Sequence, residues 1–232
     1  MITNNYYPCG RGGVLSVQKI PVGRHVGAGL ERDVYLHPTN DGLVIKIRRK
    51  GATQDRNAIE HEYLSFVKSN PLLPRTYGWV ETQLGRGLVY ERIRDADGQT
   101  SATLATALKT GRVTPDGARL LMSGAVETLI RNGILVHDDN LNNFLVQRTG
   151  NRLNLVMVDG FGSLVMTLKA RVRMYFPVLA RHKISRHAQA LMPHLEKALE
   201  EMASCHAGLT GERAEGWVQV HGNEPAPELF NS

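Results

Sequence analysis

Short apolar runs separated by turn-forming residues dominate the first part of the chain and predict a small antiparallel β-sheet. Over 26–47, apolar residues alternate or cluster with β-branched types, which indicates two or three strands. The segment 38–42 contains proline, asparagine, aspartate and glycine, and it predicts a hairpin turn between two of them. Two later runs, 77–80 and 87–93, flank a glycine-containing turn and indicate two more strands.

One segment of this region has a helical period instead. Over 57–68 the apolar side chains recur every three or four residues, which predicts a single amphipathic helix. Ile59, Tyr63 and Phe66 fall on one stripe of this helix, and Leu64 and Val67 fall on the adjacent stripe together with Glu60.

After residue 95 the pattern changes toward helix. Thr114 before Pro115 predicts a capped helix start, and Gly133 ends the same helix. A strand pair is expected at 144–147 and 153–158, around a polar turn. Two more helices are expected between residues 164 and 206, broken near Pro177 and Pro193. The sequence thus predicts an α+β protein.

Composition adds little to this picture. Of the 232 residues, 42% are hydrophobic, which is ordinary for a folded protein that buries a core. The net charge of +6 favours an acidic partner such as a nucleotide or a phospholipid headgroup. Cys9 and Cys205 are too few for a disulfide framework, and no secretory leader or membrane-spanning run is apparent. We therefore expect a cytoplasmic protein.

The strongest chemical signal is a set of carboxylates and amides around the predicted strand pair. Asp138 and Asn143 are five residues apart before the pair, and Asp159 follows it. Together, 136–146 and 158–162 resemble the catalytic loop and the metal-binding turn of protein kinases. The resemblance implies that Asp138 is the base toward an acceptor hydroxyl, and that Asn143 and Asp159 hold magnesium on the phosphates of ATP.

Both segments depart from the kinase pattern. The family's His-Arg-Asp is Val136-His137-Asp138 here, and glycine follows the metal-binding aspartate at Gly160. If His137 is matched to the family's histidine, Asp139 becomes the candidate base at a spacing of four, so the spacing favours Asp138 and leaves Asp139 as the alternative. A polar loop before a hairpin is the other interpretation.

Upstream, residues 27–34 resemble a glycine-rich nucleotide-binding loop. Gly27, Gly29 and Val34 match its pattern, whereas Arg32 replaces the third glycine. Glycine is needed there because backbone amides must approach phosphate without an intervening Cβ, and the charge of Arg32 can itself face phosphate. An ordinary hairpin turn is the alternative.

The phosphate-binding lysine and its partner glutamate also have counterparts. Lys46 ends an apolar strand, where burial is costly unless the ammonium group meets an anion. A solvent-exposed lysine at a strand edge is the alternative. Glu60 is the expected partner, because Leu64 and Val67 follow it at the family's offsets, and Glu62 should then face water. The run 88–93 resembles the strand that leads into the hinge, where backbone groups at Glu91 would bind adenine. An ordinary core strand is the alternative.

Over residues 20–165 the order of elements resembles the protein-kinase-like family, and more narrowly the bacterial PhoP regulatory network protein YrbL family. The narrower resemblance rests on the strings at 34–38, 74–78, 80–82 and 87–90. It implies a two-lobed protein-kinase-like fold, with a small antiparallel β N-lobe containing one helix and a short, mainly helical C-lobe. The expected divisions are a lead-in at 1–20, the N-lobe at 21–94, the C-lobe at 95–215 and a loose tail at 216–232.

The implied activity is an ATP- and Mg²⁺-dependent phosphotransferase that transfers the γ-phosphoryl group to a hydroxyl acceptor such as a protein serine or threonine. A kinase of a small molecule, lipid or saccharide is one alternative. A nucleotide-binding pseudokinase that acts as a regulatory module is another, suggested by Arg32, Gly160 and the altered His-Arg-Asp.

A basic stretch between residues 169 and 187 could contact lipid headgroups, lipopolysaccharide phosphates or nucleic acid, but a solvated helix face is the favoured interpretation. Peripheral membrane contact therefore stays open. Nucleic acid is not an expected partner, because it leaves the ordered lysine, glutamate, aspartate and asparagine series without a role. The stretch comprises Lys169, Arg171, Arg173, Arg181, His182, Lys183, Arg186 and His187.

Overall fold

The computed structural model of the chain describes residues 19–67, 69–163 and 181–214. They belong to two compact units, one that ends at Leu195 and one that begins at Glu196. The tail, the neighbourhood of Pro177 and the predicted lead-in except for its last two residues lie outside the described residues. All the site residues discussed below belong to the first unit.

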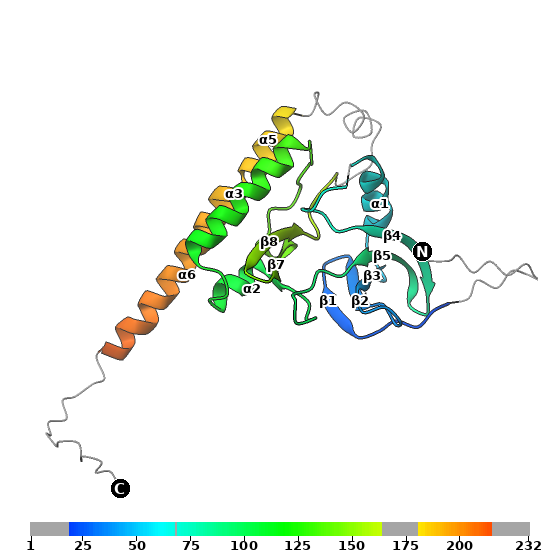
Figure 1. Ribbon diagram of the computed structural model, residues 1–232, viewed down its shortest axis with the longest axis horizontal. Coiled ribbons are helices and arrows are strands. Elements are labelled where there is room, and N and C mark those ends of the chain that lie inside the picture. Colours follow the sequence, from blue (N-terminus) through cyan, green and yellow to red (C-terminus); the bar gives the residue numbers. More distant parts are fainter. Residues whose placement is uncertain (1–18, 68, 164–180, 215–232) are drawn as a thin grey trace, which may run out of the picture. The chain divides into compact units, whose positions relative to one another are not determined.

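Among the described residues, a five-stranded antiparallel sheet forms in the order β1-β2-β3-β5-β4 (Figure 1). This confirms the strands and the hairpin turn that the apolar pattern predicted before β3. The isolated bridge from Ile20 to Thr82 adds the start of the described chain beside β4. The strands are β1 (His25–Ala28), β2 (Arg32–Leu36), β3 (Leu43–Arg48), β4 (Thr76–Thr82) and β5 (Gly85–Glu91).

The two faces of this sheet bury different sets of side chains because successive residues of a strand point to opposite sides. On one face, Leu43, Ile45 and Ile47 form a core cluster with Val89. On the other, Val44 packs with Leu88 and Tyr90, and Leu64 of the neighbouring helix covers them. Lys46 alternates onto this second face, which is why an ammonium group enters a buried layer.

Helix α1 (Arg56–Phe66) begins where Asp55 caps the amide of Ala58 at 3.1 Å, and it lies beside the sheet in Figure 1. Its buried face differs from the predicted apolar stripes. Phe66 is 38% exposed and Ile59 is only half-buried. The side chains that α1 buries are mostly polar, because they belong to a network beneath the sheet; they are Arg56, Asn57, Glu60 and Tyr63.

A second, three-stranded sheet in the order β6-β7-β8 follows in the chain. Strands β7 (Phe144–Thr149) and β8 (Arg152–Met157) form the predicted pair. Strand β6 (Ala102–Thr103) and helix α2 (Leu104–Lys109) were not predicted, since two and six residues are too short to establish a period. Residues Leu141–Asn143 form a single 3₁₀ turn, η1, just before β7.

The predicted helix at 115–133 is α3 (Pro115–Arg131), capped by the Thr114 hydroxyl, which accepts the amide of Gly117 at 3.1 Å. Further on, α5 (Arg181–Gln189) and α6 (Leu191–Ala214) replace the predicted break at Pro193. Pro193 lies in the first turn of α6, where its missing N–H has no helical partner to lose, so the break falls at residue 190 instead.

Within the described part of the chain, every helix is too short or too polar to span a bilayer.

Candidate functional site

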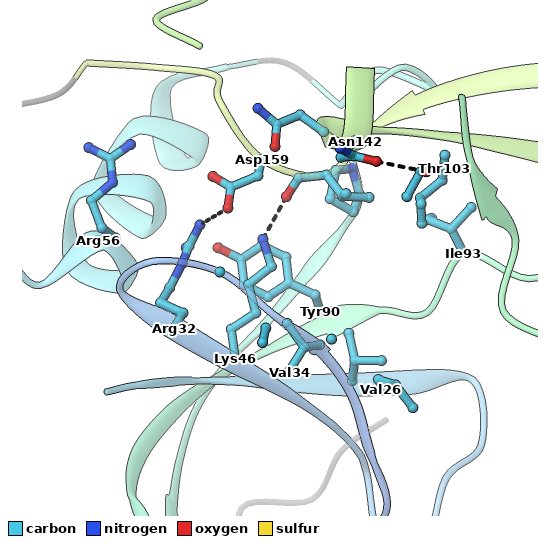
Figure 2. A pocket seen from close by; sticks show the side chains of 18 of the residues that line it. Val26, Arg32, Val34, Lys46, Arg56, Tyr90, Ile93, Thr103, Asn142 and Asp159 are labelled. Atoms are coloured by element: carbon cyan, nitrogen blue, oxygen red, sulfur yellow. Dashed lines mark hydrogen bonds and ion pairs between the residues drawn. The ribbon is translucent and has the colours of Figure 1, made fainter. Parts of the chain in front are cut away.

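A cavity of about 1120 Å³ lies between the glycine-containing turn after β1, strand β3 and the loop before β7. It is lined by nine of the residues singled out from the sequence, and Figure 2 shows part of this lining. These residues are Gly27, Gly29, Arg32, Val34, Lys46, Glu91, Asp138, Asn143 and Asp159. The tenth, Glu60, lies behind Lys46 with 1% of its surface exposed.

Lys46 is buried. A lysine in an apolar strand is expected to meet an anion if it is buried. Its Nζ donates to the backbone carbonyl of Val158 at 2.6 Å and lies 3.6 Å from Oε2 of Glu60. The ammonium group also lies 4.4 Å from the centre of the Tyr90 ring. Burial lowers the pKa of Lys46, and the Glu60 carboxylate opposes that shift. The expected Lys46–Glu60 pair is therefore present, although the lysine's closest partner is a carbonyl.

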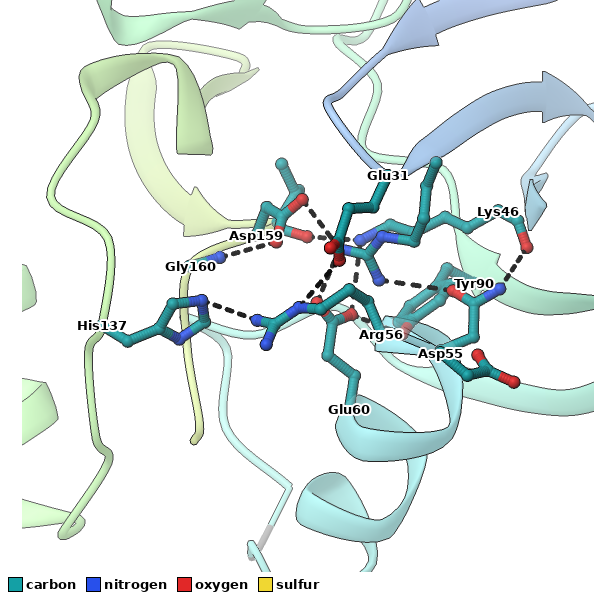
Figure 3. A network of polar contacts seen from close by, with 12 residues as sticks. Glu31, Lys46, Asp55, Arg56, Glu60, Tyr90, His137, Asp159 and Gly160 are labelled. Carbon is teal, nitrogen blue, oxygen red and sulfur yellow. Dashed lines mark hydrogen bonds and ion pairs between the residues drawn. The ribbon is translucent and has the colours of Figure 1, made fainter. Parts of the chain in front are cut away.

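Glu60 is the centre of the buried network drawn in Figure 3. Its Oε1 accepts a hydrogen bond from Arg32 at 2.7 Å, and its Oε2 accepts the hydroxyl of Tyr90 at 2.7 Å. Burial, together with this carboxylate, raises the pKa of Tyr90 well above its usual value. Glu62, expected in water, is half-buried.

Arg32 links the glycine-containing turn to the segment after β8. Its guanidinium reaches Oδ2 of Asp159 at 2.7 Å in addition to Glu60, and it is 5% exposed. Burial alone would lower the pKa of Arg32, but Glu60 and Asp159 together raise it. For Asp159 the effects have the opposite sign. Burial alone would raise its pKa, but the charges of Lys46 and Arg32 hold the pKa well below its usual range.

The structure separates the two candidate bases. Asp138 lines the cavity, whereas Asp139 lies 3.7 Å from Nδ1 of His194 at the start of α6. The backbone of Asn143 accepts the amide of Val158 at 2.8 Å, which ties the loop to the end of β8. The Nδ2 atom of Asn143 is buried and has no hydrogen-bond partner among the described residues.

The structure explains why glycine occupies position 160. Its φ is 80°, and a Cβ there would lie 2.6 Å from the carbonyl oxygen of Asp138 and 2.8 Å from Nδ2 of Asn143. Its own carbonyl accepts the amide of His137 at 2.8 Å. A phenylalanine side chain would not fit here, and the aromatic side chain follows one residue later as the fully buried Phe161.

Arg56 contacts His137, as Figure 3 also shows, and nothing in the sequence pattern predicted this contact. Nη2 of Arg56 donates to Nε2 of His137 at 2.6 Å, and Nη1 donates to the carbonyl of Ser163 at 3.4 Å. Burial, and then the charge of Arg56, lowers the pKa of His137. Position 56 gave no motif signal, since an arginine at a helix start is ordinary.

The apolar part of the lining was also missed, apart from Val34. Side chains from β1, β3 and β7 contribute to it together with Ile93, and Figure 2 labels Val26 and Ile93. Alternating apolar positions could have signalled this surface, but the same pattern is produced by core residues that line nothing. The apolar residues added by the structure are Val26, Val44, Ile93 and Leu145.

Nothing in the described chain brings three or more His, Cys, Asp or Glu side chains together as a complete metal site. The pair that the sequence suggested, Asn143 and Asp159, does line one cavity. An amide and a carboxylate are oxygen donors of the kind that Mg²⁺ takes, and Mg²⁺ commonly keeps waters and uses substrate phosphates for its other positions. The residues present therefore fit a magnesium ion that arrives with phosphate.

The fold and the site together define a mixed α+β protein with a large cavity beside an antiparallel sheet, lined by both apolar and charged side chains. A family model described as PhoP regulatory network protein YrbL matches residues 22–196, and the chain belongs to this family.

Two curated proteins are similar to part of the chain. The protein YrbL of Escherichia coli (strain K12), described as uncharacterized, is 33% identical over 101 residues. The protein of the same description from Shigella flexneri is likewise 33% identical over 101 residues. The match covers 41% of this chain and 48% of each relative, so the chain spans about half the length of the curated relatives it matches.

Proposed function

We propose that this protein has a kinase-like two-lobed arrangement, binds ATP in the cavity and transfers its γ-phosphoryl group to a hydroxyl acceptor. The observation that carries the proposal is the convergence of Lys46, Glu60 and Asp159 at one end of the cavity. Lys46 bonds a carbonyl 112 residues away, one residue before Asp159, so this cluster does not arise from local sequence. A buried lysine beside two carboxylates is the arrangement that phosphoryl transfer uses to hold phosphates and a metal.

The cavity walls suit the parts of a nucleotide. Val34, Val44 and Leu145 supply apolar surface for a flat base. Glu91 lines the cavity at the end of β5, but its amide already donates to the carbonyl of Arg75 at 2.9 Å, so that N–H is not free to bind the edge of the base. Gly27 and Gly29 lie at the phosphate end. A Cβ on either would make only ordinary contacts of 3.6 Å or more, so the protein's own packing does not demand glycine there. Close approach of a phosphate group to the backbone would explain why glycine occupies these two positions.

In this proposal Asn143 and Asp159 hold Mg²⁺, which when bound would neutralise charge on the phosphates. Lys46 binds phosphate oxygens while Glu60 keeps its ammonium group in place. Asp138 orients the acceptor hydroxyl and receives its proton. Because positioning and charge neutralisation dominate in such sites, loss of either aspartate should cost turnover more than nucleotide binding.

The test is label transfer from γ-labelled ATP with magnesium, alone and with an extract of the host cells. Asp138→Ala is the informative variant. Asp139→Ala is its matched control, because Asp139 faces His194 rather than lining the cavity. We expect labelling by the native chain and by the Asp139 variant and none by the Asp138 variant. Labelling that survives Asp138→Ala would refute the assigned base.

The second candidate is a pseudokinase that binds nucleotide and regulates a partner through its conformation. It is favoured by the Arg32–Asp159 ion pair at 2.7 Å, because a carboxylate already paired with a cation is not free to hold a metal. It predicts that ATP raises the melting temperature, as ligand linkage requires, while no acceptor is labelled. No melting shift with ATP in the native chain would remove both candidates.

The acceptor class stays a matter for screening among protein, saccharide and lipid hydroxyls. Exposed basic side chains on α5, namely His182, Lys183 and Arg186, leave peripheral contact with an anionic membrane as part of the proposal. His187 does not belong to that face, because its Nδ1 donates to the carbonyl of Val136 at 2.9 Å. The side chains at 169, 171, 173 and 181 lie outside the described residues. A cytoplasmic location and the absence of a nucleic-acid role remain our predictions.

A further inference from the structure

Both oxygens of the Asp159 carboxylate have partners from the chain itself. Oδ1 accepts the amide of Gly160 at 2.8 Å, and Oδ2 meets Nη2 of Arg32 at 2.7 Å. Figure 2 shows Arg32 reaching across the cavity from the end of the glycine-containing turn to this carboxylate. The side chain of Asp159 is 41% exposed, so it remains accessible from the cavity despite these contacts.

Arg32 is held by more than Asp159. Nη2 donates to Oε1 of Glu60 at 2.7 Å, and Nη1 donates to Oδ1 of Asn57 at 3.3 Å. The planar guanidinium can address two carboxylates at once, which the single ammonium group of a lysine does less well. If Arg32 lost its contact with Asp159, it would still donate to the carboxylate of Glu60 and the amide oxygen of Asn57. Its buried charge would therefore keep a partner.

A divalent ion at Asp159 and the guanidinium of Arg32 would compete for the same oxygen. Two cations within bonding distance of one carboxylate repel each other strongly, and a single negative charge cannot balance them. Lys46, which faces Glu60 3.6 Å away in the same cluster, adds a third positive charge.

We propose that Arg32 is a resident cation of the Asp159 carboxylate, and that a divalent metal ion binds Asp159 only when Arg32 leaves it. This inference rests on the proposed role of Asp159 as a metal ligand. Arg32 thereby sets how readily the site takes a metal, and phosphate groups are the anions that would receive its charge.

Metal affinity tests this directly, with Mn²⁺ as the probe and the electron paramagnetic resonance signal of free Mn²⁺ as the readout. We expect Arg32→Gln to bind Mn²⁺ about 10- to 100-fold more tightly than the native chain, the range over which groups beside a ligand tune metal sites. Adding Asp159→Asn to that variant should abolish the gain. Arg49→Gln is the matched control, because Arg49 lines the same cavity but pairs with Asp33 at 2.7 Å.

Equal Mn²⁺ affinity in the native chain and in Arg32→Gln would overturn the inference, as would a gain that survives Asp159→Asn. Arg32→Lys is the second variant should the glutamine variant fail to fold, as judged by circular dichroism. Lysine keeps a positive charge beside Glu60 but lacks the planar guanidinium that can donate to two carboxylates at once. We therefore expect Arg32→Lys to raise the Mn²⁺ affinity as well, but by less than Arg32→Gln. No gain in a folded lysine variant would also overturn the inference.

Melting with ATP in EDTA and in Mn²⁺ separates this inference from the proposed function. A metal gain in Arg32→Gln without any nucleotide effect on melting, in that variant or in the native chain, would support the resident cation and refute the nucleotide site. A nucleotide effect without the metal gain would refute the resident cation alone.

Discussion

At the scale of single residues, the site depends on one carboxylate that satisfies several buried donors. Glu60 accepts Arg32 on one oxygen and Tyr90 on the other, with Lys46 3.6 Å away. A buried ion pair is a weak argument for net stability, because desolvation offsets attraction. Removing one partner is a different matter, since the remaining charges then lie buried without compensation.

Glu60→Gln should therefore lower the free energy of unfolding by about 3–5 kcal/mol, the range for breaking a buried pair. Asp33→Asn is the comparison, because it breaks the solvent-screened pair with Arg49 and should cost far less than Glu60→Gln. Urea unfolding followed by circular dichroism measures both. Equal decreases in the free energy of unfolding of the two variants would show that Glu60 contributes no more to stability than an exposed ion pair does.

The pH dependence of stability reports on Asp159. Its pKa is depressed in the folded protein, so the unfolded chain binds its proton at higher pH than the folded one does. The contribution of the ionised carboxylate is complete above about pH 5 and is lost as pH falls below about 4 toward the folded pKa. The native chain should therefore exceed Asp159→Asn in stability near neutral pH, and the gap should narrow on acidification. A gap constant from pH 6 to about pH 3 would contradict the depressed pKa.

At the scale of elements, the turn after β8 depends on a glycine that is crowded as well as left-handed. Gly98 makes a matched control for Gly160, since both have φ of 80° but a Cβ at Gly98 would meet nothing within 4 Å. Gly98→Ala should cost about 1 kcal/mol from backbone conformation alone. Gly160→Ala should cost at least about 2 kcal/mol more, as overpacking does. Thermal or urea unfolding of the two variants decides this, and similar costs would show that the loop yields easily.

The same scale shows what could be predicted from the sequence. Strands β2, β3 and β5 were predictable because β-branched runs and a hairpin turn act locally. The buried face of α1 was not, because periodicity analysis assigns apolar side chains to the core and this helix buries a polar network instead.

For the site, the resemblance of short segments to the protein-kinase pattern brought Lys46, Glu60 and Asp159 to attention, and the structure places them together. The Arg56–His137 contact spans 81 residues and joins two side chains whose local sequence is unremarkable. Only tertiary structure brings such pairs together, so spacing arguments cannot find them.

At the scale of the whole molecule, contacts far apart in sequence join the five-stranded sheet to the segments that follow it. Lys46 bonds the carbonyl of Val158, and the amide of Met157 donates to the carbonyl of Leu72 at 2.7 Å. Such coupling favours one cooperative transition for the compact unit that ends at Leu195.

We expect coincident urea unfolding curves from two probes of that unit. Fluorescence of Trp79 in β4, isolated by Trp217→Phe, reports on the sheet, and deuterium exchange of the α3 amides at the same urea concentrations reports on a helix of the same unit. Separate midpoints would show that the sheet unfolds independently of the rest. Arg32→Gln should keep the curves coincident, since the backbone contacts at Val158 and Leu72 remain.

The hydrogen bond of Tyr63 affects how fast α1 can move away from the segment after α3. Its hydroxyl accepts the amide of Leu135 at 2.9 Å, and its ring lies where a Cβ on Gly162 would be 3.0 Å away. Burial raises the pKa of this hydroxyl to about 12, so it stays protonated across the working range. Helix α1 therefore cannot swing outward by rotating side chains alone, because the Leu135 amide would lose its partner. Exchange of that amide with solvent deuterium should follow slow sub-global opening, over minutes to hours, rather than nanosecond fluctuation.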